Sequence, residues 1–500
     1  MVIRLDLAVV VLMATAFVAP ALAEESAPTE IPPPQSYSSS HSGKFGGHTV
    51  NYTATAGETY LKDDDDEPKA SIFSIAYIKD GVDDPTTRPV TFLWNGGPGS
   101  CSVWLHMGAF GPKRVAVPSD AKDDGAPPFR MEDNPLTILD VTDLVFVDPV
   151  GTGYSRALGE HENKEFWGIS EDGRSIAEFI RAWITTNRRW ASPKYIGGES
   201  YGTTRSAAVI RELEGGFDDV AVNGLILIST VMDFYTSAFE TGNELGYVTY
   251  LPTMAATAAY HGKIDPPPAD LEAFLVEARE FAIAEYAPAL LRGNTLPAAE
   301  RNRIRKKLSY FTGISEDYFK LSDLRITDQR YYKELLRDEG LVVGRLDGRF
   351  TGRDIDNAGE APESDPSFYG IDGAYTAAIN HYLASELGVE IDRQYKIFGS
   401  VYREWNWELP GEGFRSFNIN VAPYIGTAMR QNSALRVFNA AGYYDFATPF
   451  FDAEMSFMRN GVVPDRITYA YYQSGHMMYI HEPSLLQLMD DVRGFIQAGR

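Results

Sequence analysis

The stretch Gly198-Glu199-Ser200-Tyr201-Gly202 decides how the rest of the chain is interpreted. It has the pattern G-x-S-x-G, in which small residues around a serine allow a strand to turn sharply into a helix. A short apolar run at 194–196 precedes it, and 203–213 has the spacing of a helix packed closely on a sheet. The pattern predicts a serine hydroxyl exposed at the carboxyl edge of a sheet. The alternative is a glycine-rich turn with no chemistry.

Strand-like and helix-like segments alternate along most of the chain. Apolar runs predict buried strands at 90–94, 143–147 and 224–229, and the sheet pattern returns with strands at 434–440 and 466–472. Residues 48–60 and 70–79 alternate as strands do, and one-sided apolar patterns predict helices at 170–190 and 483–498. This order predicts an α/β fold with a mostly parallel central sheet and helices on both faces.

One long stretch interrupts the alternation. Residues 237–355 are mostly helical and charged, with helix candidates at 271–286 and 297–312. We interpret them as an inserted helical cap between two parts of the core, 43–236 and 356–500. Residues 24–42 are rich in Pro, Ser and Glu, which predicts a disordered lead.

The N-terminus has the features of a secretory signal peptide. Residues 1–23 contain an early Arg4, a short apolar run and a small-x-small site before Glu24. The alternative is an uncleaved N-terminal anchor. Cys101 is the single cysteine, so an intramolecular disulfide is excluded. Export together with one cysteine favours a bacterial periplasmic or secreted protein.

The net charge and the motifs of the sequence indicate which kinds of partner to expect. The net charge of −24 argues against nucleic acid and anionic membranes, which attract basic patches. The acidic run 63–67 lacks the spaced ligands of a calcium loop, so a solvated hairpin tip is the better interpretation. We find no metal cluster, phosphate loop or dinucleotide fingerprint in the sequence, and expect no cofactor and no membrane partner after signal cleavage. The sequence leaves the oligomeric state open.

Two later strands end in residues that could activate the serine. A serine hydroxyl needs a histidine base and a carboxylate that orients this base. Asp445 follows the run 434–440 by a short turn, and His476 follows 466–472, in the chain order Ser, Asp, His. The rivals are His481, which lies next to the closing helix, and Asp452, which is expected inside a helix. His106 could line a pocket but breaks the chain order.

A glycine-rich loop follows the first buried strand. Asn95-Gly96-Gly97-Pro98-Gly99 would bring backbone N–H groups close to a substrate, opposite the N–H of Tyr201. Such donors stabilise the oxyanion that forms during acyl transfer. The alternative interpretation is a plain tight turn.

Together these motifs resemble the serine carboxypeptidases. The resemblance is carried by W-N-G-G-P-G at 94–99, G-x-E-S-Y-G at 197–202, G-H-M at 475–477, N-P-L at 134–136 and the segment 148–155. It implies an α/β-hydrolase fold with a helical cap, and release of single amino acids from peptide C-termini through a serine ester. The implied roles are Ser200 as nucleophile, His476 as base, Asp445 as its partner, Gly97 and Tyr201 as oxyanion donors, and Asn95, Gly96 and Glu199 as ligands of the substrate carboxylate.

Glu199 gives this resemblance a physical prediction. An ionised Glu199 would repel the terminal carboxylate of a substrate, whereas a protonated Glu199 can donate a hydrogen bond to it. Peptidase activity is therefore expected to be best in acid.

The sequence also departs from the family pattern. Ala109 occupies a position where many members carry a second glutamate, so one carboxylate contact is expected to be missing. Cys101 near the glycine loop is interpreted as a small buried residue. Two other functions stay open: an esterase or acyltransferase on the same fold, and a binding protein on an inactive scaffold.

Overall fold

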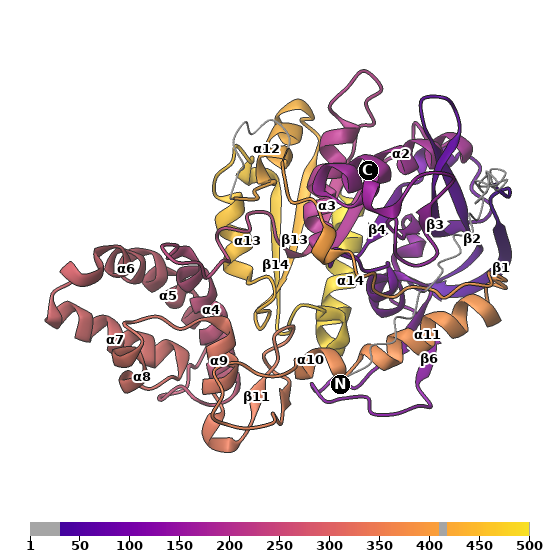
Figure 1. Ribbon diagram of the computed structural model, residues 1–500. Coiled ribbons are helices and arrows are strands. Elements are labelled where there is room, and N and C mark those ends of the chain that lie inside the picture. The colour runs from indigo at the N-terminus through magenta and orange to yellow at the C-terminus, as the bar shows by residue number, and fades with distance from the viewer. Residues whose placement is uncertain (1–30, 410–417, 500) are drawn as a thin grey trace, which may run out of the picture.

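A computed structural model of the chain describes residues 31–409 and 418–499, and its centre is one large sheet (Figure 1). The strand order is β1-β2-β3-β7-β4-β9-β10-β13-β14, with β8 (Arg156–Ala157) paired to β3. The strands from β7 to β14 run parallel, and β1, β2 and β3 are antiparallel. The bounds are β1 Ser36–Phe45, β2 His48–Lys62, β3 Pro68–Lys79, β4 Val90–Trp94, β7 Asp143–Val147, β9 Lys194–Ser200, β10 Gly224–Thr230, β13 Arg436–Gly442 and β14 Ile467–Tyr472. The predicted α/β fold with a mostly parallel sheet is confirmed.

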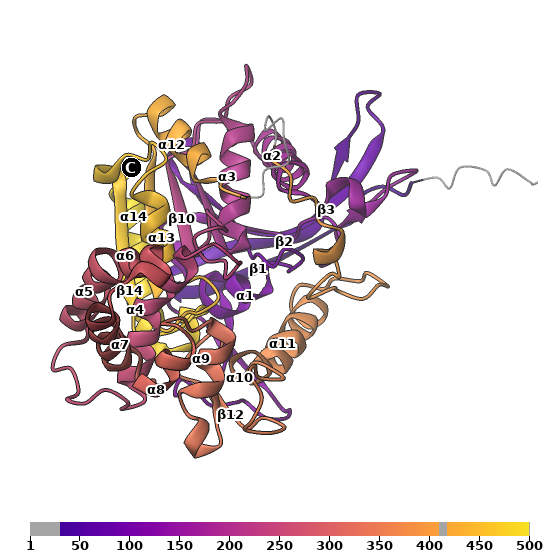
Figure 2. The same cartoon turned by 60° about the vertical axis from the view of Figure 1, so that its left-hand side comes forward.

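Helices cover both faces of the sheet (Figure 2). On one face, α2 (Ile169–Thr186), α3 (Tyr201–Leu213) and α12 (Ala422–Gln431) share an apolar core with the strands. The rings of Trp183 and Phe92 meet edge to face at 5.4 Å, and burial of side chains of this kind contributes about 1.5–3 kcal/mol each. On the other face, α11 (Asp372–Ser385) and α14 (Glu482–Gln497) share a second core.

The helix predicted at 170–190 ends earlier than expected. Helix α2 stops at Thr186, and Arg188 has a φ of 56°. A left-handed backbone cannot continue a right-handed helix. Trp190 is consequently exposed beyond the helix end.

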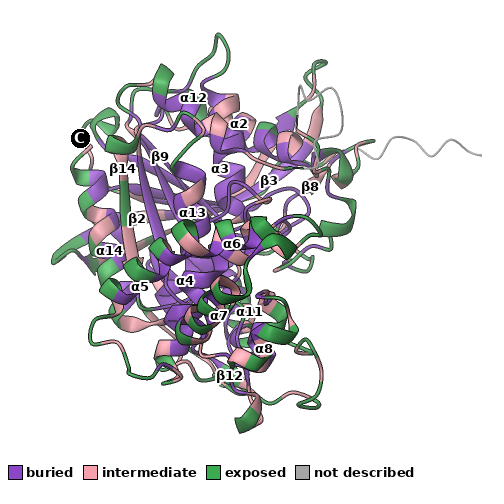
Figure 3. Ribbon diagram, turned by 90° about the vertical axis from the view of Figure 1, so that its left-hand side faces the viewer, coloured by how far each residue is buried: buried purple, intermediate pink, exposed green. Residues whose placement is uncertain are grey.

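The inserted stretch forms a helical body of its own, at the left of Figure 1. Its helices are α4 (Leu245–Tyr260), α5 (Leu271–Phe281), α6 (Ala287–Arg292), α7 (Ala298–Thr312), α8 (Glu316–Leu321) and α9 (Asp328–Glu334). They surround a separate apolar core, which Phe450 of α13 (Phe450–Phe457) joins from the sheet side. Helices α5 to α8 of this body each have an exposed side, whereas α4 and the central strands are mostly buried (Figure 3).

The predicted disordered lead is wrong from Ser36 onward. Strand β1 pairs antiparallel with β2, with Phe45 opposite His48 and a turn at Gly46-Gly47 between them. Both glycines have positive φ, as a tight hairpin turn requires. The sequence does not show this strand clearly because its serines are mostly exposed at an edge of the sheet, and only the glycine pair marks the hairpin.

Two N-terminal expectations lie largely outside the described residues: the signal peptide at 1–23, and the part of the lead before residue 31. Among the helices of the described residues, none combines the length and the apolar character needed to cross a membrane. The acidic run at 63–67 lies in the turn between β2 and β3, where the Asp63 carboxylate accepts the backbone N–H of Asp65 and Glu67.

Candidate active site

Ser200 lies at a sharp turn between β9 and α3. Its φ of 60° and ψ of −132° are strained for a residue other than glycine, and strain of this kind concentrates at functional sites. The turn needs the glycines on either side. A Cβ on Gly198 would lie 2.1 Å from the Gly202 carbonyl oxygen, and one on Gly202 would lie 3.1 Å from the Asn95 carbonyl group. The G-x-S-x-G pattern is therefore required by close backbone contacts.

Asp445 and His476 meet at the same edge of the sheet. Asp445 follows β13 and His476 follows β14, and His476 Nδ1 lies 2.8 Å from Asp445 Oδ2. Two backbone N–H groups, of Ala447 and Thr448, donate to Asp445 Oδ1 at 2.8 and 3.0 Å. The Thr448 hydroxyl donates to Oδ2 at 2.7 Å. The carboxylate is thus held in one orientation, which fixes the imidazole.

The environment of His476 adjusts its basicity. Burial alone would lower the pKa of this imidazole, but the charge and hydrogen bond of Asp445, helped by Glu199, raise the pKa above its usual value. Ser200 and His476 line one cavity, and within residues 31–409 and 418–499 no hydrogen bond joins their side chains. In serine hydrolases this hydrogen bond often shortens only when substrate binds.

The glycine loop after β4 lies directly against the serine turn. A Cβ on Gly96 would lie 2.5 Å from the backbone nitrogen of Tyr201, so the two segments that were predicted to supply oxyanion donors are in contact. Gly97 has a φ of 105°, a conformation open to glycine. The loop is held from below by Arg205, whose guanidinium donates to the Asn95 carbonyl oxygen and forms a buried ion pair with Asp172.

Glu199, which lies beside Ser200 in the sequence, is buried. Its side chain is 3% exposed, and burial raises the pKa of its carboxyl group from 4.5 to about 7. Asp445 raises this pKa as well, whereas His476, the Tyr479 hydroxyl and the Asn95 amide oppose the shift. Glu199 therefore changes between a neutral hydrogen-bond donor and an anion close to neutral pH.

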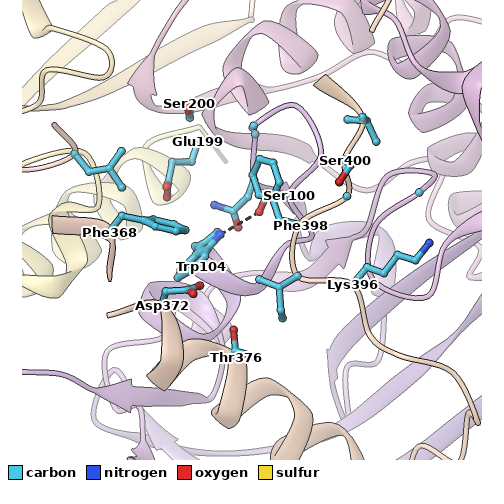
Figure 4. Close-up of a pocket in the computed structure, with 18 of the residues that line it drawn as sticks. Ser100, Trp104, Glu199, Ser200, Phe368, Asp372, Thr376, Lys396, Phe398 and Ser400 are labelled. Carbon is cyan, nitrogen blue, oxygen red and sulfur yellow. Dashed lines mark hydrogen bonds between the residues drawn. The ribbon is translucent and has the colours of Figure 1, made fainter. Parts of the chain in front are cut away.

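A cavity of about 1400 Å³ opens over these residues, lined by Asn95, Gly96, Gly97, Glu199, Ser200 and His476 on its catalytic side. Figure 4 shows Phe368 and Trp104 on the side of the Glu199 carboxyl group, Asp372 beyond Trp104, and Phe398 and Ser400 on the side of Ser100. The rings of Trp104 and Phe368 lie 6.1 Å apart. The cavity thus has an aromatic wall next to Glu199.

The rival residues lie outside this arrangement. The imidazole of His481 contacts the Ser484 hydroxyl at 2.7 Å, at the start of α14. Asp452 is buried inside α13 and binds Thr236. His106 is fully buried, stacks on Phe146 at 4.2 Å and contacts the Tyr77 hydroxyl, so it is a core residue.

Cys101 is buried, as predicted, and burial raises the pKa of its thiol well above the usual value. A thiol of this kind is not a nucleophile near neutral pH.

Two residues of the site escaped sequence reasoning. Thr448 supports Asp445, and its position three residues after the aspartate is the spacing at which a side chain can cap a turn. Tyr479 donates its hydroxyl to Glu199 Oε2 at 2.8 Å. Ala109 is buried, and its carbonyl oxygen accepts from the Asn134 amide.

A strained serine, a histidine–aspartate pair and a glycine loop at the carboxyl edge of a parallel sheet form the arrangement typical of serine hydrolases of the α/β type. Residues 49–236, which carry the glycine loop and Ser200, match the family described as serine carboxypeptidase. Over this part of its length the chain is similar to the serine carboxypeptidases.

Plant proteins are similar to this chain in sequence, and a yeast protein is similar to it in structure. Serine carboxypeptidase-like 13 of Arabidopsis thaliana is 26% identical over 153 residues, 30% of this chain and 34% of the relative. Serine carboxypeptidase-like 7 of the same plant is 28% identical over 134 residues, 26% of this chain and 29% of the relative. The chain thus spans about a third of the length of these relatives. The crystal structure of Kex1(delta)p, a prohormone-processing carboxypeptidase from Saccharomyces cerevisiae, shares the fold with a TM-score of 0.53 at 15% identity, over 89% of this chain and 91% of that one.

Proposed function

We propose that the protein is a serine-type carboxypeptidase that releases single amino acids from peptide C-termini. The observation that carries the proposal is Glu199, a buried carboxyl group one residue before the nucleophile, in the wall of the same cavity. With Asn95 and Gly96 it forms a group of hydrogen-bonding partners for a terminal carboxylate. The match of residues 49–236 to the serine carboxypeptidase family supports the same conclusion.

The proposed reaction proceeds through an acyl-enzyme. His476 takes the proton of Ser200 while Ser200 Oγ attacks the last peptide carbonyl. The backbone N–H groups of Gly97 and Tyr201 bind the oxyanion. The protonated His476 then gives its proton to the leaving amino group, and water, activated by the same imidazole, hydrolyses the ester on Ser200.

Acid conditions should favour peptide substrates. Below its pKa of about 7, Glu199 is neutral and donates a hydrogen bond to the substrate carboxylate; above it, two anions repel each other. The lower limit comes from His476, which must be neutral to act as base, and whose pKa is raised. Neutralising Glu199 removes one of the charges that raise the pKa of His476, so the two groups titrate as a coupled pair.

Mass spectrometry of a defined peptide mixture, incubated at several pH values, tests the proposal. We expect stepwise loss of residues from C-termini, strongest in acid, and no loss from the same peptides carrying C-terminal amides in acid. Internal cuts, or no cuts, would overturn the activity. A fluorophosphonate should label wild-type protein but not Ser200→Ala, and absence of labelling in both would support a binding protein.

The esterase or acyltransferase alternative has one observation in its favour, the alanine at position 109. Hydrolysis of simple esters without any release of amino acids would support it.

We further propose that residues 1–23 direct export. N-terminal sequencing of protein secreted from a bacterial host should begin at Glu24, and a chain that keeps Met1 would contradict this.

A further inference from the structure

Tyr479 binds one oxygen of Glu199 from behind the cavity wall. Its hydroxyl donates to Glu199 Oε2 at 2.8 Å, and the ring is 2% exposed. Glu199 lines the cavity, whereas Tyr479 is absent from the lining and lies in the turn Met478–Ile480 just after His476. The same turn therefore places the catalytic base and a fixed donor to Glu199.

The wall around this hydrogen bond is tightly packed. A Cβ on Gly108 would lie 2.5 Å from the Tyr479 ring and 2.7 Å from the Tyr375 hydroxyl. Tyr375 also packs on Trp104, with ring centroids 4.9 Å apart. Tyr479 consequently has little freedom to rotate away from Glu199.

We propose that Tyr479 is a positioning residue: it occupies Glu199 Oε2, so that the acidic proton of Glu199 resides on Oε1 and is available to the carboxylate of a bound peptide. The inference rests on the proposed function for the identity of the bound group. A phenol is a donor through the whole working range of pH, because burial raises the pKa of Tyr479 well above its usual value. Tyr479 thus remains a hydrogen-bond donor over the pH range in which Glu199 gains or loses its proton.

The other groups that act on Glu199 do not replace this role. His476 and Asp445 act through charge, with opposite signs, and the Asn95 amide favours the anion. Tyr375 is close but donates no hydrogen bond to Glu199 within the described residues. Ala109 contributes no polar side chain at this wall. Tyr479 is therefore the donor whose removal should change Glu199 most directly.

The first test measures Glu199 itself. Infrared spectra of the carboxyl band are recorded from pH 4 to 9, with the spectrum of Glu199→Gln subtracted. Tyr479→Phe removes a hydrogen-bond donor that stabilises the Glu199 anion, so the midpoint of the Glu199 titration should rise by about one pH unit. Tyr375→Phe, a matched loss of a buried hydroxyl, should leave it within about 0.3 unit. No shift in Tyr479→Phe, or equal shifts in both variants, overturns the proposal.

The second test separates peptide binding from ester chemistry. At pH 5, Tyr479→Phe should raise the KM for a peptide about five- to tenfold, with kcat and simple ester hydrolysis changed less than about threefold. The pH above which Tyr479→Phe loses activity on peptides should rise together with the midpoint of the Glu199 titration in the infrared spectra. An equal loss on ester and peptide would indicate a structural role and contradict the proposal.

Two further measurements keep the outcomes distinct. If wild-type protein cleaves no peptide while Tyr479→Phe still shifts the Glu199 midpoint, the proposed function fails and the hydrogen-bonding role stands. If Tyr479→Phe does not fold, incorporation of 3-fluorotyrosine, a stronger donor, should lower the Glu199 midpoint in the wild-type sequence. An unchanged midpoint there overturns the proposal.

Discussion

Arg205 Nε donates to Asp172 Oδ2 over 2.7 Å, and this ion pair is buried below the glycine loop. Arg205 also donates to the Asn95 carbonyl oxygen. A charge on α2 and a charge on α3 thus support the backbone of the glycine loop. Burial raises the pKa of Asp172 to about 6, although the guanidinium opposes this shift, so desolvation of the pair is substantial.

Arg205→Met should lower the free energy of unfolding by about 3–5 kcal/mol, because it leaves Asp172 buried without its partner. Urea unfolding measures this change. The matched control is Arg292→Ala, which breaks the exposed Arg292–Glu300 pair and should change the stability by less than about 1 kcal/mol. Equal effects of the two variants would contradict a supporting role for the buried pair.

Gly96→Ala should abolish most catalysis on peptides and esters alike. The added Cβ would lie 2.5 Å from the Tyr201 nitrogen and 2.7 Å from the Gly202 nitrogen, so the loop must move away from the serine turn. Loss of an oxyanion donor lowers kcat by about 10²–10³-fold. Gly494→Ala, where a Cβ meets no atom within 4 Å, is the control and should keep full activity. A Gly96→Ala enzyme with normal kcat would exclude this loop from the reaction.

Thr448→Val should lower kcat/KM about three- to tenfold, since Asp445 keeps its two backbone donors but loses the hydroxyl. Without the competing donor, Asp445 Oδ2 stabilises protonated His476 more strongly, which raises the pKa of His476. The acid limit of ester hydrolysis should then move to higher pH. Thr295→Val, at an exposed turn, is the control. An acid limit of ester hydrolysis that stays in place or moves to lower pH would contradict the role given to Thr448.

Asp452→Asn should change how stability depends on pH. Burial raises the pKa of Asp452 from 3.8 to about 7, and nearby Asp233 adds to the shift while Thr236 opposes it. Between about pH 4 and 7 the folded protein holds a proton that the unfolded chain has released, so this carboxyl group contributes a stability that falls as pH rises.

The difference in unfolding free energy between Asp452→Asn and wild type should therefore grow from pH 4 to pH 7, by about 1.4 kcal/mol per unit at most. Urea unfolding at several pH values measures it. Asp64→Asn, on the exposed hairpin tip, should give a flat difference. A flat difference for Asp452→Asn as well would show that the carboxyl group is not perturbed in the folded state.

The residues that the sequence predicted best are those at the ends of parallel strands. Ser200 ends one parallel strand, and Asp445 and His476 each follow another, and parallel strands bring such positions to one edge whatever the chain between them does. Glu199 and the glycine loop could be predicted for the same reason, because each lies at the end of a parallel strand.

Features that depend on packing between distant segments could not be predicted in this way. Tyr479 is an ordinary aromatic residue until its turn is placed behind Glu199. The Arg205–Asp172 pair joins two helices whose charged residues look solvent-exposed in the sequence. Strand β1 is polar, and it becomes a strand only through its pairing with β2.

The packed wall formed by Gly108, Tyr375 and Tyr479 has a steric consequence for the proposed reaction. Glu199 lines the cavity and the buried ring of Tyr479 lies behind it, so this side of the cavity ends at Glu199. Under the proposed function, the free end of a bound peptide would stop against this wall, and the space between Ser200 and the wall would set how much of that end is cut off.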